Sequence, residues 1–137
     1  MRRLRVGLTA EAMVCLEAIK GRVVIIGGVA RGVASGESEF KTKDLDLLYD
    51  FNSHRAYEAI QGAVKAAQSR GDLTPESSTI GHWWFDEDEA GIHLELMPYH
   101  YGPGYKTIRR RVFYVSVDGL VLMCAEGRDC PADKTDD

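Results

Sequence analysis

The hydrophobic and polar positions along the chain change period several times, which predicts alternating helices and strands. Apolar residues three to four positions apart indicate helices, and short apolar or alternating runs indicate strands. The predicted helices cover residues 9–20, 29–34, 53–70 and 119–127. The predicted strands cover residues 22–26, 44–49, 80–85, 92–97 and 111–117. The expected order of elements is therefore α-β-α-β-α-β-β-β-α.

Capping and turn residues support several of these boundaries. Thr9 is placed to cap the first helix, and Gly21 is placed to end it. The acidic residues 86–89 predict the turn of a hairpin. Asp118 is interpreted as the cap of the last helix, and residues 128–137 as a polar tail that frays.

Strands interleaved with helices predict the α/β (α+β) class, with helices packed on one mixed sheet. The chain has 137 residues, a length that suits one domain. No repeat, linker or low-complexity segment divides it. Residues 1–137 are therefore expected to form a single domain.

Composition and charge exclude several classes of protein. Hydrophobic residues make up 45% of the chain and charged residues 28%, so disorder and fibre are poor interpretations. The net charge of −4 is too mild for a protein that coats nucleic acid. No apolar run approaches the ~20 residues that span a bilayer, and the basic N-terminus lacks the apolar core of a secretory signal. A cytoplasmic location without a membrane partner is expected.

The three cysteines predict neither a disulfide framework nor a zinc site. Cys15, Cys124 and Cys130 are widely spaced, form no C-x-x-C pair and have no histidine at ligand spacing. They are interpreted as buried or idle thiols in a reducing compartment.

Carboxylates gather on two of the predicted strands. Asp44 and Asp46 are two residues apart on one strand, so both side chains point to the same face. Glu95 stands on a later strand whose leucines face the other way. If the two strands are neighbours, the three acids form a cluster suited to hard divalent ions. Two such ions support in-line displacement at phosphorus.

A glycine turn supplies the complementary half of this site. Gly27 and Gly28 follow a buried strand directly and open a short helix. Glycine lets phosphate oxygens approach the backbone, and the N–H groups at a helix N-terminus attract anions. We expect the turn to lie beside the carboxylates.

The order of these motifs resembles that of the nucleotidyltransferase superfamily related to DNA polymerase β, in particular its small stand-alone bacterial and phage members. That family has a strand, a Gly-Gly or Gly-Ser turn opening a helix, an Asp-hydrophobic-Asp strand and a third acid on a later strand. Here these motifs are residues 25–32, 41–48 and 93–98. Residues 115–129 resemble the late helix and the Gly-Arg-Asp turn of those proteins.

The resemblance implies an enzyme that moves NMP from an NTP to a hydroxyl and releases pyrophosphate. Asp44, Asp46 and Glu95 would be its catalytic residues and would hold two Mg²⁺ ions, for which Mn²⁺ can substitute. Glu95 would also be the base or orienter of the acceptor hydroxyl. The residues expected to bind the nucleotide are Gly27, Gly28, Arg31 and Lys43, although Lys43 is equally compatible with a solvated surface position.

Two departures from the family pattern bear on the acceptor. The third acid is Glu rather than the commoner Asp, and the chain stops where many relatives add acceptor-binding helices. We therefore expect a homo-oligomer, a helical partner chain or a large substrate. RNA such as a tRNA 3′ end, a protein hydroxyl and a small antibiotic remain open as acceptors. The alternatives are a non-catalytic, antitoxin-like regulator that binds nucleotide or protein and, more weakly, a metal-dependent phosphohydrolase.

Aromatic residues and histidine near the acids are secondary candidates. Trp83 and Trp84 are adjacent on a strand, so only one can face a ligand while the other belongs to the core. His93 shares a face with Glu95 and is interpreted first as its hydrogen-bonded neighbour.

Two further groups flank the last strands. Arg109, Arg110 and Arg111 precede a predicted strand, and a solvated strand start is favoured over contact with RNA or phosphate. The tyrosines of the loop after the third acid either border the acceptor site or pack on the sheet; they are Tyr99, Tyr101 and Tyr105.

Overall fold

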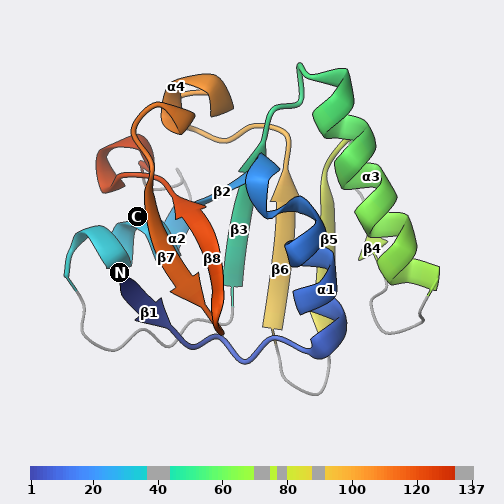
Figure 1. The fold of residues 1–137 in the computed structure, drawn as a ribbon. Helices are drawn as coiled ribbons and strands as arrows, with labels where there is room; N and C mark the ends of the chain where they lie inside the picture. The colour runs from blue at the N-terminus through green and yellow to red at the C-terminus, as the bar shows by residue number, and fades with distance from the viewer. Residues whose placement is uncertain (37–43, 70–74, 77–79, 88–91, 132–137) are drawn as a thin grey trace.

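The computed structural model describes residues 1–36, 44–69, 75–76, 80–87 and 92–131. These residues form an eight-stranded mixed sheet with helices packed on it (Figure 1), so the predicted fold class is confirmed. The helices are α1 (Ala10–Ile19), α2 (Gly27–Ala34), α3 (His54–Ser69) and α4 (Tyr105–Arg109), with 3₁₀ turns η1 (Lys20–Arg22) and η2 (Gly127–Asp129). The strands are β1 (Arg2–Leu4), β2 (Val23–Ile26), β3 (Asp44–Tyr49), β4 (Pro75–Glu76), β5 (Trp83–Glu87), β6 (Ile92–Met97), β7 (Phe113–Val117) and β8 (Leu120–Cys124).

The strand order in the sheet is β1-β7-β8-β2-β3-β6-β5-β4. β3 runs antiparallel to β2 on one side and parallel to β6 on the other. β2 is in turn parallel to β8, and β5 is antiparallel to β6. The two predicted acidic strands are therefore direct neighbours at the middle of the sheet.

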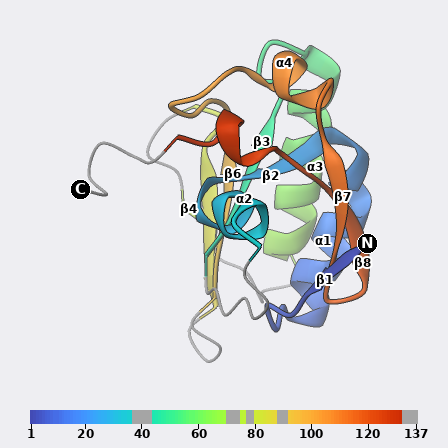
Figure 2. The same ribbon diagram turned by 90° about the vertical axis from the view of Figure 1, so that its left-hand side faces the viewer.

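Helices α1 and α3 cover one face of β3, β6 and β5 (Figures 1 and 2). The alternating leucines of the acidic strands point into this layer, and Leu45, Leu47, Leu94 and Leu96 are all buried. They meet apolar residues of the two helices such as Leu16 and Ile60, which are fully buried. The period-two pattern thus buries the leucines on one face and leaves the carboxylates on the other.

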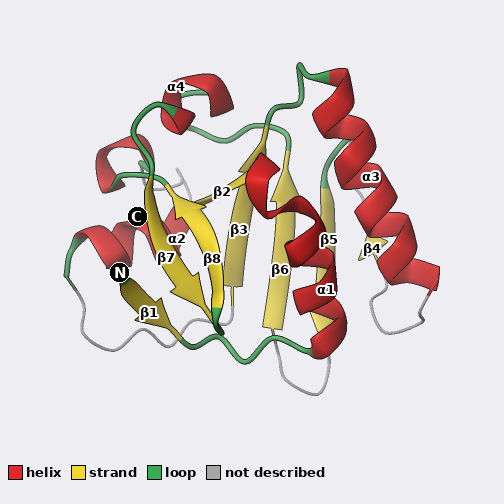
Figure 3. Cartoon of the chain, in the orientation of Figure 1, coloured by secondary structure: helices red, strands yellow, loops and turns green. Residues whose placement is uncertain are grey.

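The helix predicted for residues 119–127 is wrong, because Leu120–Cys124 forms strand β8 of a hairpin with β7 (Figure 3). Asp118 and Gly119 both have positive φ, at 50° and 88°. A two-residue loop with this geometry is the turn that Asp-Gly favours between antiparallel strands. A short apolar run does not distinguish a buried strand from a helix.

Asp118 therefore caps no helix and instead accepts hydrogen bonds from a distant loop. Its carboxylate oxygens accept from the backbone N–H groups of Val6, Gly7 and Leu8, at 2.7–2.9 Å. These contacts fasten the segment between β1 and α1 to the hairpin turn.

The sequence analysis did not predict β1, β4 or α4. These elements have only three, two and five residues, which is too short for a periodic pattern to show. The predicted tail at 128–137 is described only as far as Pro131, and Asp129 and Cys130 within it are buried. Cys15 and Cys124 are buried as well, as predicted. Within the described part of the chain, no helix combines the length and apolarity needed to cross a membrane.

Candidate active site

The pairing of β3 with β6 brings the predicted acids together. In this parallel ladder Asp46 is the register partner of Glu95, and Asp44 is the partner of His93. Register partners point to the same face, and neighbouring strands lie about 4.8 Å apart. Asp44 is exposed and Asp46 half-buried, and the Glu95 side chain is 22% exposed. The face opposite α1 and α3 therefore carries Asp44, Asp46 and Glu95.

The glycine turn adjoins this acidic face directly. Ile26, the last residue of β2, is the antiparallel partner of Asp46. Gly27 follows with φ +72°, and a β-carbon built there would lie 2.6 Å from Asp46 Oδ2. Among the described residues, no side chain forms a capping hydrogen bond at the N-terminus of α2. Backbone N–H groups of a helix start therefore lie beside the Asp46 carboxylate.

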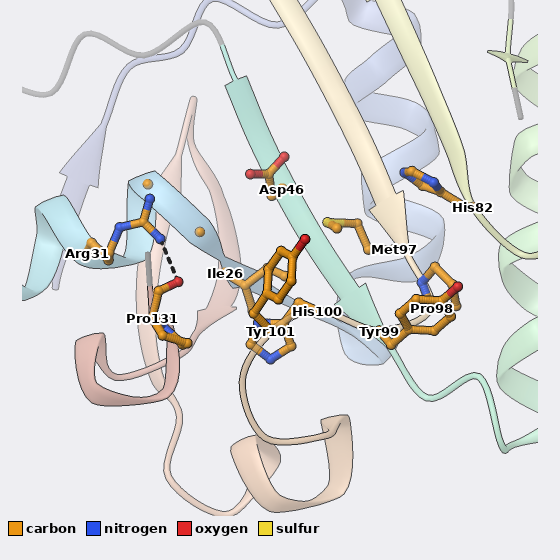
Figure 4. Close-up of a pocket in the computed structure, with 12 residues that line it drawn as sticks. Ile26, Arg31, Asp46, His82, Met97, Pro98, Tyr99, His100, Tyr101 and Pro131 are labelled. Carbon is orange, nitrogen blue, oxygen red and sulfur yellow. Dashed lines mark hydrogen bonds between the residues drawn. The ribbon is translucent and has the colours of Figure 1, made fainter. Parts of the chain in front are cut away.

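A pocket of about 450 Å³ opens between these elements (Figure 4). Its floor includes Asp46 and His82, and one wall is the glycine turn with Arg31 of α2. The opposite wall is the end of β6 and the loop after it. The residues of that wall are Met97, Pro98, Tyr99, His100 and Tyr101. The pocket thus has a polar end at the glycines and carboxylate and an apolar, aromatic end at the loop.

His82 is a pocket residue that the motifs of the sequence do not single out. Its Nε2 lies 2.5 Å from Glu95 Oε1, and the two side chains are 19% and 22% exposed. Trp84, two residues after His82, is the register partner of Glu95 in the ladder of β5 and β6. Its ring centroid lies 5.3 Å from that of the His82 ring. Strand alternation over residues 82–84 is the signal that could have placed His82 on the face of Glu95.

The C-terminal residues of the described chain form another side of the pocket. Arg31 Nη1 donates to the carbonyl of Pro131 at 3.2 Å and reaches that of Cys130 at 3.5 Å. Burial raises the pKa of the Cys130 thiol, while a hydrogen bond with the Gly27 backbone and the charge of Arg31 oppose the rise. The thiol therefore lies under the glycine turn.

An ion pair between half-buried Arg111 and buried Asp129 anchors this C-terminal segment. Asp129 is 3% exposed and receives two hydrogen bonds from Arg111, from Nε at 3.1 Å and from Nη2 at 2.6 Å. A bidentate pair of this kind holds both planes in one geometry. It positions η2, and with it Pro131, at the pocket.

Comparison with solved structures finds a similar chain in the lincosamide antibiotic adenylyltransferase LnuA, crystallised with lincomycin bound. The two share 11% sequence identity with a TM-score of 0.53, over 87% of this chain and 80% of LnuA. The chain has the nucleotidyltransferase fold. The solution structure of the antibiotic-resistance factor ANT(2'')-Ia also matches, with 14% identity and a TM-score of 0.43, over 90% of this chain but only 63% of that protein. No family model and no curated protein matches the chain.

The carboxylates of Asp44, Asp46 and Glu95 are the type of ligand that a hard divalent cation prefers. Three carboxylates on two adjacent strands offer oxygen donors of the kind that Mg²⁺ and Mn²⁺ prefer. Among the described side chains, no three His, Cys, Asp or Glu groups lie in an arrangement that could hold a metal ion as they stand. The register of β3 with β6 places Asp44, Asp46 and Glu95 on one face, so these are the residues that would hold such an ion.

The remaining candidates divide between the site and the core. Trp83 packs on the core and stacks with Tyr49, with ring centroids 6.5 Å apart, while Trp84 lies on the face of Glu95, so the division of the tryptophans is confirmed. Tyr99 and Tyr101 border the pocket, whereas Tyr105 packs on the core.

The last candidates from the sequence are Lys43, His93 and the arginines at 109–111. Lys43 and the side chain of His93 lie outside the described residues. The interpretation of residues 109–111 as a strand start is wrong, because Arg109 ends α4 and β7 begins at Phe113.

Proposed function

We propose that the protein is a metal-dependent nucleotidyltransferase that moves NMP from an NTP to a hydroxyl of a small organic acceptor. The observation that carries this proposal is the position of Asp46. It is the register partner of Ile26 on one side and of Glu95 on the other, and it touches the glycine turn. One residue thus joins a phosphate-binding helix start to a second carboxylate, and the nucleotidyltransferase fold supports this interpretation.

In this proposal each residue of the site has a defined role. Asp44, Asp46 and Glu95 would hold two Mg²⁺ ions, and the ions would supply positive charge for the triphosphate and for the attacking oxygen. The backbone of Gly27 and Gly28 accommodates the phosphate oxygens. Arg31, already tied to the Pro131 carbonyl, contributes positive charge on the same wall. Lys43, which directly precedes Asp44 in the chain, is kept as a candidate phosphate contact.

In the reaction one phosphorus–oxygen bond forms and one breaks. The acceptor oxygen bonds to the α-phosphorus as the bond from that phosphorus to the pyrophosphate oxygen breaks. The hydroxyl proton passes to the Glu95 carboxylate, and pyrophosphate leaves.

The pocket favours a small acceptor over RNA or protein. Its volume of about 450 Å³ lies in the range of about 300–1,000 Å³ that small-molecule sites occupy. Its far end carries Tyr99 and Tyr101, which offer flat apolar surface to a ring. LnuA was solved with lincomycin, a small molecule. Arg111, which precedes β7, is already paired with Asp129. The cytoplasm, which supplies NTP and Mg²⁺, is the proposed location.

The experiment is incubation with each α-³²P-labelled NTP and Mg²⁺ in the presence of small-molecule hydroxyl compounds, tRNA or total protein. We expect pyrophosphate release and label on a small molecule. Asp44→Ala should abolish transfer, while Asp50→Asn, a change just beyond the same strand, should not. Inorganic phosphate in place of pyrophosphate would indicate a phosphohydrolase. Nucleotide binding without any turnover would indicate the non-catalytic regulator.

A further inference from the structure

The contact between His82 and Glu95 joins the residue that precedes β5 to strand β6. His82 Nε2 and Glu95 Oε1 are 2.5 Å apart, and both side chains are about four-fifths buried. An ionised carboxylate can only accept a hydrogen bond, so the imidazole donates from Nε2. His82 itself lines the pocket (Figure 4).

The backbone before His82 is held firmly from the opposite face of the sheet. The buried Tyr49 hydroxyl donates to the Gly81 carbonyl at 2.6 Å. Burial also raises the pKa of Tyr49, so this phenol keeps its proton. Gly81 has φ +80°, and a β-carbon there would lie 2.6 Å from the Tyr49 hydroxyl oxygen. The position of residue 81 is therefore determined by β3, the same strand that carries Asp46.

The imidazole ring of His82 is also restrained beyond its backbone. The Trp84 ring lies beside it with centroids 5.3 Å apart and planes at 57°. Trp84 is the register partner of Glu95. The histidine is therefore held between an anchored glycine and an aromatic ring, with its Nε2 directed at the carboxylate.

We propose that His82 is a positioning residue that orients Glu95 for cation binding beside Asp46, a role that rests on the proposed function. A carboxylate with one oxygen bound to a fixed donor loses the free rotation of its terminal torsion. The other carboxylate oxygen of Glu95 is then held on the same face of the sheet as Asp46, its register partner. Groups that hydrogen-bond a metal-binding side chain in this way typically change metal affinity by about 10–100-fold when removed.

The test compares His82→Leu, which has no donor, with His82→Gln, whose amide nitrogen stands near the position of Nε2. A matched control is His54→Leu, because His54 and Glu58 form another His–Glu pair at 2.9 Å on the exposed surface of α3. Mn²⁺ affinity is measured by electron paramagnetic resonance without acceptor. We expect His82→Leu to lower Mn²⁺ affinity about 10–100-fold, and His82→Gln and His54→Leu to stay near wild type.

Turnover and nuclear magnetic resonance supply two further readouts. We expect His82→Leu to lower kcat and His82→Gln to restore most of it, while KM for the acceptor stays near the wild-type value in both variants. The Nε2–H signal of His82 in the wild-type protein should persist when Mg²⁺ and a non-hydrolysable NTP analogue are added. This measurement needs no variant, so it holds even where His82→Leu does not fold.

The results distinguish the two proposals. A His82→Leu protein with wild-type Mn²⁺ affinity and kcat overturns the positioning role, and transfer by the wild type leaves the nucleotidyltransferase proposal standing. Loss of the Nε2–H signal on addition of Mg²⁺ and nucleotide also overturns the positioning role. A wild-type protein that binds no Mn²⁺ and transfers no label overturns the proposed function, and the positioning role with it.

Discussion

The backbone at Gly27 lies so close to Asp46 that a β-carbon at position 27 would stand 2.6 Å from the Asp46 Oδ2 oxygen. The next glycine is different, since the nearest atom that a β-carbon at Gly28 would meet within the described part of the chain is Arg31 Nη2, at 3.8 Å. Gly27 also has φ +72°, a backbone angle that a residue with a β-carbon adopts only with strain. Two adjacent glycines therefore have separate functions, one in the packing against Asp46 and the other in the helix start.

Gly27→Ala should lower the free energy of unfolding by about 2 kcal/mol, because alanine is strained at this φ and displaces the Asp46 carboxylate. Gly28→Ala should leave stability unchanged or raise it by about 0.5 kcal/mol, because alanine favours the helix. Urea denaturation measures both. Under the proposed function, Gly28→Ala still weakens NTP binding, since its methyl group occupies the phosphate approach. Equal stability of the two variants would contradict the role of Gly27.

Asp118→Ala should destabilise the protein by about 3 kcal/mol. The change removes the acceptor of three backbone N–H groups, and alanine is strained at φ 50°. Asp118→Asn should cost about half as much, because asparagine tolerates this φ and keeps one acceptor oxygen. Chemical denaturation of the two variants checks the order. A loss as large for asparagine as for alanine would show that charge, and not acceptor geometry, holds the loop.

The stability of the protein should fall as pH rises above about 9. Burial raises the pKa of the Cys124 thiol from 9.0 to about 12, with Cys130 adding to the rise. Below pH 9 the thiol is protonated in both states. Between pH 9 and 12 only the unfolded chain releases the proton, which favours unfolding by up to about 1.4 kcal/mol per pH unit. Burial also raises the pKa of the fully buried Tyr49 and of the half-buried Tyr105, and both act in the same direction at higher pH.

The contribution of Cys124 is isolated by comparison with Cys124→Ala. Urea denaturation of both proteins at several pH values should give a shallower slope for the variant between pH 9 and 12. Parallel slopes would mean that the Cys124 thiol ionises as readily in the folded protein as in the unfolded chain.

Much of the site was predictable because it depends on local alternation. The pattern around Asp44 and Asp46 and that around Glu95 each predicts which side chains share a face, and the register of β3 with β6 confirms this. The glycine turn was predictable because Gly27 and Gly28 directly follow a β-branched run.

Other features depend on contacts that sequence periodicity does not encode. The hydrogen bond of His82 with Glu95 requires β5 to pair with β6 in one particular register. The error at Leu120–Cys124 arose because five apolar residues fit a helix as well as a strand. The Asp118-Gly119 turn was the signal that should have decided it. The Asp129–Arg111 pair spans 18 residues and two elements, so only the folded chain places it.

The most direct test of the carboxylate site is a crystal structure with Mn²⁺ and a non-hydrolysable NTP analogue, with manganese located by anomalous scattering. We predict manganese bonded to carboxylate oxygens of Asp46 and Glu95 and the triphosphate lying over Gly27 and Gly28. An ordered nucleotide whose phosphates lie away from the glycine turn, or a manganese ion that neither carboxylate touches, would contradict the account.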